Sequence, residues 1–135
     1  MKIVAKLLIK NGGEYLMMYR SNHPTFGDDP DLPGGTSEES ESGLVAMLRE
    51  VDEEIGLRLV SGEVKEIYSG DEYSNHGTFY SLFIANLSEK PKVLMSWEHS
   101  SYEWMSKEEF IEKARKANDT YMHMVADVFS SLRKS

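Results

Sequence analysis

The sequence contains no cysteine among its 135 residues, which excludes disulfides, thiolate zinc sites and cysteine nucleophiles. It also lacks long apolar runs. The longest are only a few residues, whereas about 20 are needed to cross a bilayer, so we expect no membrane-spanning segment. The first apolar stretch is interrupted by Lys6 and Lys10 and has no small-residue cleavage site, so it is typical of a strand rather than a signal peptide. We therefore expect a cytoplasmic protein.

Basic residues are scarce in one part of the chain. Between Ser21 and Leu57 there are ten acidic residues and one base, Arg49, so this segment has a net charge of −9. The rest of the chain has a net charge of +1, which gives the total of −8. Such an acidic segment repels nucleic-acid phosphates, so we expect no nucleic-acid partner. An anionic substrate could bind here only with a cation between, and a divalent metal is the simplest choice.

The overall composition is that of an ordinary globular chain, with 40% hydrophobic and 28% charged residues. The length suits one domain, over residues 1–135. Turn signals and apolar periodicity predict strands, a central helix and C-terminal helices, which is an α+β arrangement. The predicted segments are a hairpin over 3–10 and 14–20, a loop over 21–35, a helix over 42–55, strands within 57–70, 77–87, 92–97 and 102–106, and helices over 106–117 and from 119.

The central helix has two different sides. Its apolar residues fall within roughly 100° of arc, which predicts that this side packs on the sheet. They are Leu44, Met47, Leu48, Val51 and Ile55. Glu50, Glu53 and Glu54 share another flank, where like charges three and four residues apart repel. This flank is either a solvated acidic surface or a site for a hard divalent cation with oxygen ligands.

The residues around these glutamates decide between the two readings. Gly35, Glu41, Arg49, Glu50, Val51, Glu53, Glu54, Gly56 and Leu57 match every specified position of the pattern G-x5-E-x7-R-E-U-x-E-E-x-G-U, where U is aliphatic. This is the Nudix box, and the chain resembles the Nudix hydrolases related to MutT. The resemblance implies the Nudix fold, in which a mixed β-sheet is sandwiched between α-helices. It also implies hydrolysis of a nucleoside diphosphate linked to another group, with Mg²⁺ as cofactor and Mn²⁺ as a possible substitute.

The resemblance also assigns roles. It implies that Glu50, Glu53 and Glu54 bind the metal, with the backbone carbonyl of Gly34 as a further ligand. One of the glutamates can accept a proton from the attacking water. Arg49 and Glu41 fall at positions that support these carboxylates. At two positions the chain departs from the family, with Pro30 in place of a common aromatic residue and Ser40 in place of a common glycine.

One further carboxylate is expected from outside the box. Nudix enzymes often supply it from a loop before the strand that leads to the C-terminal helix, and Glu98 occupies that place, with Glu103 as the alternative. Trp97 could anchor this loop, and His99 is expected to be a polar loop residue. The competing interpretation is that Glu98 is an ordinary exposed loop residue.

The substrate is less defined by the sequence. Gly35, Arg20 and Asn118 are the candidate substrate-binding residues; an asparagine near the last helix suits a purine edge, although a turn or helix-cap role is the favoured interpretation of Asn118. We favour a nucleoside triphosphate or an oxidised deoxynucleoside triphosphate. The alternatives are a diadenosine polyphosphate, for which Tyr73 is a weak signal, a nucleotide sugar, or a module that senses a nucleotide without cleaving it. Either a monomer or a homodimer is expected.

Overall fold

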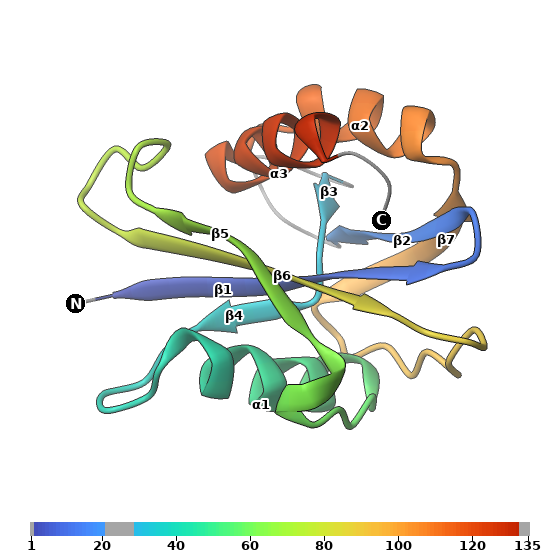
Figure 1. Cartoon of the computed structure of the whole chain (residues 1–135), viewed down its shortest axis with the longest axis horizontal. Helices are drawn as coiled ribbons and strands as arrows, with labels where there is room; N and C mark the ends of the chain where they lie inside the picture. Colours follow the sequence, from blue (N-terminus) through green and yellow to red (C-terminus); the bar gives the residue numbers. More distant parts are fainter. Residues whose placement is uncertain (1, 21–28, 133–135) are drawn as a thin grey trace.

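The computed structural model describes residues 2–20 and 29–132, so most of the predicted loop over 21–35 lies outside the described residues. Figure 1 shows a central sheet with helices on both sides. The strands are β1 (Ile3–Asn11), β2 (Glu14–Arg20), β3 (Pro30–Asp31), β4 (Gly34–Thr36), β5 (Lys65–Gly70), β6 (Phe79–Asn86) and β7 (His99–Met105). The helices are α1 (Gly43–Ile55), α2 (Lys107–Arg115) and α3 (Thr120–Ser131), with a short 3₁₀ turn, η1, at Ser61–Glu63.

The sheet is mixed and splits near its centre. β1 pairs in parallel with β6 along its whole length, and β6 pairs antiparallel with β5. The predicted hairpin is confirmed, but β1 and β2 pair only at its turn, where Lys10 faces Tyr15. Farther from the turn, β4 pairs with β1 and β3 pairs with β2, while β7 lies along the other side of β2. The short strands β3 and β4 therefore fill the gap between two splaying strands.

Alternation along β1 directs its side chains to two cores, one on each face of the sheet. Leu7 and Ile9 pack with Met47, Val51 and other residues on the side of α1. Leu8 packs in the opposite core with α2 and α3, so the sheet lies between helices as predicted (Figure 1). The predicted α+β sandwich is confirmed.

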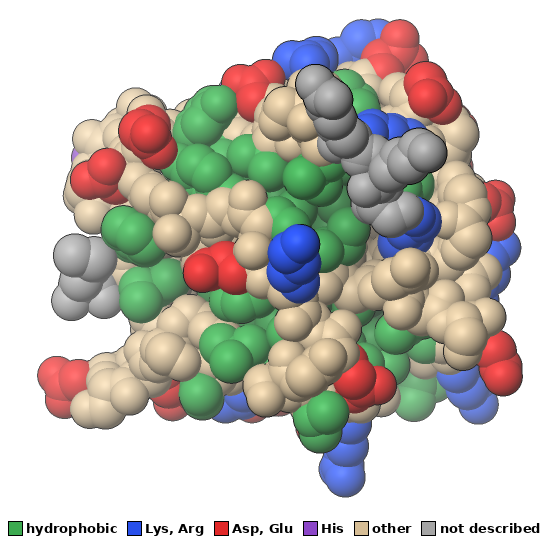
Figure 2. Space-filling view, in the orientation of Figure 1, with side chains coloured by type: hydrophobic (Ala, Val, Ile, Leu, Met, Phe, Trp, Pro, Cys, Tyr) green, Lys and Arg blue, Asp and Glu red, His purple; other side chains and the backbone are tan. Residues whose placement is uncertain are grey.

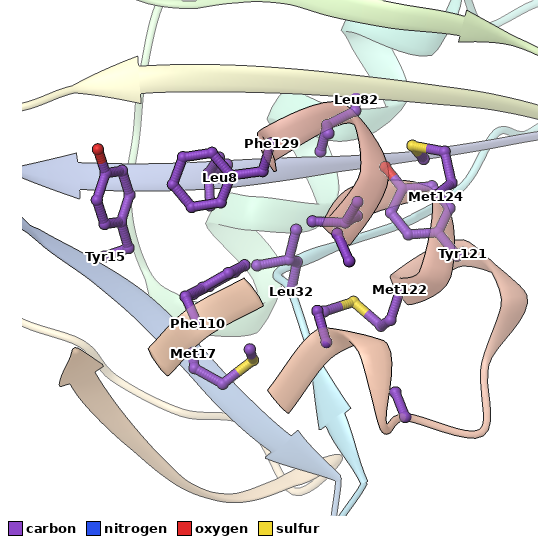
Figure 3. Close-up of a cluster of buried hydrophobic side chains, with 14 of the residues drawn as sticks. Leu8, Tyr15, Met17, Leu32, Leu82, Phe110, Tyr121, Met122, Met124 and Phe129 are labelled. Atoms are coloured by element: carbon purple, nitrogen blue, oxygen red, sulfur yellow. The ribbon is translucent and has the colours of Figure 1, made fainter. Parts of the chain in front are cut away.

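Aromatic side chains dominate the core beneath α2 and α3 (Figure 3). The ring of Phe129 lies 4.7 Å from that of Tyr15 and 5.5 Å from that of Phe110, both in edge-to-face geometry. Met17 and Met122 are fully buried beside them, so these methionines fill the core.

The helices begin and end close to the predicted boundaries, and capping residues account for these ends. The Ser42 hydroxyl accepts a hydrogen bond from the Val45 N–H at the start of α1, and Gly56 ends the helix at a φ of +72°. Ser106 caps α2 by accepting from the Glu109 N–H, and Asp119 caps α3 by accepting from the Tyr121 N–H. These local signals were sufficient to locate all three helices.

The prediction of a strand over residues 92–97 is wrong. This segment has no strand partner among the described residues, and it runs instead past the end of α1. There the Leu94 N–H donates to the carbonyl of Ile55 and the Ser96 N–H donates to that of Glu54. The apolar pattern of the segment reflects packing of Val93 and Met95 against the α1 core.

Figure 2 shows hydrophobic side chains gathered on the surface between α3 and the edge strand β5. A hollow of about 500 Å³ lies in this region, with Val64, Ile67, Ile84 and Leu132 among its lining residues.

Across residues 2–20 and 29–132, the helices are too short and too polar for any of them to span a bilayer.

Candidate active site

A cavity of about 630 Å³ opens beside the gap between β1 and β2. Its lining comes from five strands, helix α1, the N-cap residue of α3 and one turn, and it combines carboxylates with basic and aromatic side chains. The lining residues are Val4, Lys6, Arg20, Asp31, Gly34, Gly35, Thr36, Glu50, Glu54, Trp97, Glu98, His99 and Asp119. The structure therefore brings together Glu50 and Glu54 from the helix, both loop glycines, Glu98 and Arg20.

Glu54 is the most constrained carboxylate of this cavity. Only 7% of its surface is exposed, and its Oε1 accepts a hydrogen bond of 2.9 Å from the Gly34 N–H. Burial raises the pKa of Glu54 to about 8, against the lowering effects of the Gly34 N–H and of the Lys6 charge. Asp31 and Glu98 act in the same direction as burial. A buried carboxylate with so little compensation is suited to binding a cation.

The two loop glycines are required by close packing. Gly34 has a φ of +139°, and a Cβ there would lie 2.5 Å from the Lys6 Cα. A Cβ on Gly35 would lie 2.7 Å from the carboxyl carbon of Glu50. Glycine at these positions brings the backbone of the loop against the carboxylates of α1.

Arg49 holds several of the acidic side chains together. Its guanidinium donates two hydrogen bonds to the Glu41 carboxylate, at 2.7 and 2.9 Å. It also donates to Glu50 at 2.8 Å and to Glu53 at 3.3 Å. The hydrogen bonds from Arg49, with one from the Glu38 N–H, lower the pKa of Glu41 to about 2. Arg49 is thus placed to orient these glutamates.

The donor set has the chemistry that a hard divalent cation prefers, because it consists of carboxylate and carbonyl oxygens. The fit is incomplete in geometry: within residues 2–20 and 29–132, no three acidic or histidine side chains converge on one point. Glu50 and Glu53 are turned toward Arg49, and the Glu53 side chain is 59% exposed and does not line the cavity. Glu54, fixed by the Gly34 N–H and buried at the cavity wall, is the carboxylate that already faces inward.

The turn before β7 brings Glu98 to the cavity, whereas Glu103 lies within β7, where it accepts a hydrogen bond from the Tyr19 hydroxyl. The expectation that Trp97 anchors this loop is wrong, because the residue is 87% exposed. The expectation of a polar loop residue at His99 is also wrong. His99 begins β7 and is 6% exposed, since its ring packs against Asp31.

Asp31 is the centre of a charge network that sequence reasoning missed. Its carboxylate contacts Lys6 at 2.6 Å, Arg20 at 3.3 Å and His99 Nε2 at 3.1 Å. Burial alone would raise its pKa, but Lys6, His99 and Arg20 together hold the pKa of Asp31 well below its usual range. One signal was available: Lys6 interrupts the apolar run of β1 at a position that alternation directs to the α3 side.

The two remaining substrate-binding candidates have different positions. Arg20 lines the cavity and pairs with Asp119 at 2.9 Å in addition to Asp31. Asn118 lies in a turn before α3 and does not line the cavity. Its backbone and side-chain N–H groups donate to the Asp29 carboxylate. From that turn, it is the helix cap Asp119 that reaches the cavity.

The structure also places Ser40 and Pro30, the two residues that depart from the usual pattern of the family. Ser40 has a φ of +75°, a left-handed conformation that it alone adopts among the described residues other than glycine. A glycine there would avoid the Cβ clash, which explains why the family commonly has one. Pro30 lies in β3, opposite Tyr19 of β2.

Comparison with solved structures finds the same fold in several proteins. The MutT protein from Methanosarcina mazei Go1 is 28% identical, with a TM-score of 0.70 over 95% of this chain and 89% of that one. The Ap4A hydrolase of C. elegans is 20% identical, with a TM-score of 0.66 over 96% and 94%. The dihydroneopterin triphosphate pyrophosphohydrolase of E. coli is 20% identical, with a TM-score of 0.67 over 93% and 92%. At 20% identity, the last two similarities concern the fold alone.

The family assignment is independent of these neighbours. The family model described as NUDIX domain matches residues 2–127, nearly the whole chain. This range includes the box, the cavity and the turn that carries Glu98. The chain therefore belongs to the Nudix hydrolase family.

Proposed function

We propose that this Nudix pyrophosphohydrolase cleaves the diphosphate linkage of a nucleoside triphosphate or an oxidised deoxynucleoside triphosphate, releasing a nucleotide and phosphate or pyrophosphate. The family acts on small nucleotide derivatives. The observation that supports the proposal most is the buried Glu54 carboxylate, fixed by the Gly34 N–H at the wall of the cavity. The cavity volume of about 630 Å³ is in the range of small-molecule sites.

Nudix hydrolases generally use divalent metals, and we assign Mg²⁺ to this site. Glu50, Glu53, Glu54 and the Gly34 carbonyl would hold it. When bound, the ion would neutralise charge on the phosphates and lower the pKa of a bound water molecule. Arg49 orients Glu50 and Glu53 through its hydrogen bonds, and Glu41 in turn fixes the Arg49 guanidinium.

The remaining residues act on the substrate and on the attacking water. Glu98 lines the same cavity as Glu54 and supplies either a further ligand or the base that accepts the proton of the water. Gly35, which has no side chain, lets a phosphate approach the backbone of the loop closely. Arg20 provides a guanidinium in the cavity lining.

The test is a substrate panel with magnesium, read by phosphate release and by product mass. The panel contains nucleoside triphosphates, oxidised deoxynucleoside triphosphates, dinucleoside polyphosphates and nucleotide sugars. We expect turnover of a triphosphate to require the metal and to be lost in Glu54→Gln. Glu39→Gln is the matched control, because Glu39 is an exposed carboxylate of the same acidic segment. Binding of nucleotides without any cleavage would instead indicate a sensing module.

A further inference from the structure

Trp97 is a large apolar side chain in an unusual position. It is 87% exposed, the highest value among the exposed large hydrophobic side chains of the described residues. A single exposed apolar residue needs no functional explanation on a plain surface. Trp97, however, lines the cavity that also contains Glu50, Glu54 and Glu98. It places an aromatic surface at the mouth of the candidate active site.

The turn that carries Trp97 is fixed on both sides. On one side, the Ser96 N–H donates to the carbonyl of Glu54 at 2.9 Å, which ties the turn to the catalytic helix. On the other side, His99 begins β7, and its buried ring contacts the Asp31 carboxylate at 3.1 Å. The indole is therefore exposed on a backbone that is already held in place. Because the backbone is already ordered, only the torsions of the indole side chain lose freedom when a ligand binds.

We propose that Trp97 is a substrate-binding residue that stacks on the nucleobase of the nucleotide. This inference rests on the proposed function and adds a site for the part of the substrate that does not react. A nucleotide held by its phosphates near Glu54 must direct its nucleoside elsewhere along the cavity. Every nucleobase offers a π-face, so a tryptophan at the cavity mouth can bind it without requiring one particular base.

Polar groups in the same cavity suit the edge of a base. Arg20 and Asp119 form an ion pair of 2.9 Å, and both line the cavity. The guanidinium is a hydrogen-bond donor, and each Asp119 carboxylate oxygen has more than one lone pair. A base stacked on Trp97 would thus lie in a cavity that also contains polar groups of both kinds. Inorganic polyphosphates, which have no apolar surface, would gain nothing from the indole.

The first experiment measures KM and kcat of wild type and Trp97→Ala with two substrates. One is a nucleoside triphosphate, and the other is inorganic tripolyphosphate, which has the same anhydride linkage but no base. Loss of one stack is expected to raise KM for the nucleotide by roughly five- to hundred-fold. Its kcat should change less than about two-fold, and KM for tripolyphosphate should stay the same. Trp97→Phe should keep most of the affinity, because phenylalanine still provides a ring. Equal KM values for the nucleotide in wild type and Trp97→Ala, or an equal loss with both substrates, would overturn the proposal.

The second experiment reads binding without turnover. Trp104→Phe leaves Trp97 as the single tryptophan, and its fluorescence is titrated with a methylene-bridged nucleoside triphosphate in magnesium. We expect quenching by this analogue and none by tripolyphosphate. If no substrate is hydrolysed but the analogue quenches, the proposed function fails and the stacking site stands. If a nucleotide is hydrolysed but the analogue leaves Trp97 unchanged, the stacking site is refuted alone.

Discussion

Replacing Glu54 with glutamine separates the stability of the site from its activity. The amide oxygen can still accept the hydrogen bond from the Gly34 N–H, so the local packing is retained. What is lost is the ability to ionise. Because burial raises the pKa of Glu54 to about 8, the folded protein holds this proton more tightly than the unfolded chain does.

The sign of the pH effect follows from this difference. Below a pH of about 4.5 Glu54 is protonated in both states, and its contribution to stability is fully present. As the pH rises toward 8, the unfolded chain ionises freely while the folded protein does not, so the free energy of unfolding falls. A change in pKa from 4.5 to about 8 corresponds to an upper bound of about 5 kcal/mol, at 1.36 kcal/mol per pKa unit. A loss of a few kcal/mol is expected, since the folded protein can relax around the charge.

Denaturant unfolding of both proteins in metal-free buffer, between pH 5 and pH 8.5, measures this effect. We expect Glu54→Gln to be more stable than wild type by a few kcal/mol at pH 8.5 and nearly equal at pH 5. Added magnesium should stabilise wild type more than the variant, because it binds the ionised carboxylate. Turnover should fall by about 10²-fold or more. If the two proteins show the same pH dependence of stability, the assignment of a buried, destabilised carboxylate at Glu54 is refuted.

Three other substitutions test neighbouring parts of the site. Arg49→Ala should lower the unfolding midpoint and reduce kcat, whereas retained stability and rate would show that the acidic cluster needs no internal base. Glu98→Gln should lower kcat by at least about ten-fold with little change in KM, and Glu103→Gln, its control within β7, should have a mild effect; the reverse outcome would assign the role to Glu103. Ser40→Gly should raise the free energy of unfolding by up to about 1 kcal/mol, measured by thermal or denaturant unfolding, because it removes a side chain from a left-handed backbone conformation. An unchanged or lower stability of Ser40→Gly would show that the position carries no net strain.

The features that the sequence predicted correctly depend on local chemistry. Ser42 and Gly56 bound α1 through a side-chain cap and a left-handed backbone, and both effects act within one helical turn. Strand β1 was recognisable because its apolar residues face two cores. The spacing within the box correctly predicted that Glu50 and Glu54 lie on the same flank of the helix, since residues four apart share one side of a helix.

The features that were missed depend on partners distant in the chain. The pairing of Lys6 with Asp31 joins strands 25 residues apart, and neither residue alone signals the other. His99 looked like a loop residue because its burial arises from that same carboxylate. The segment over 92–97 has an apolar pattern like that of a strand, but its backbone N–H groups reach the end of a helix. Periodicity reports which side of a segment is apolar and not which neighbour satisfies its hydrogen bonds.

The end of α1 is where the separate parts of the site are joined. The Glu54 side chain accepts from the Gly34 N–H of β4, and the Glu54 carbonyl accepts from the N–H of Ser96, just before the turn that leads into β7. A single residue thereby aligns β4, α1 and the turn that carries Trp97 and Glu98. Because the left-handed Gly56 ends the helix two residues later, the last carbonyls of α1 are free of further helical partners and can accept these bonds. The acidic flank of the helix and the turn that carries Trp97 and Glu98 are therefore positioned by the same turn of backbone.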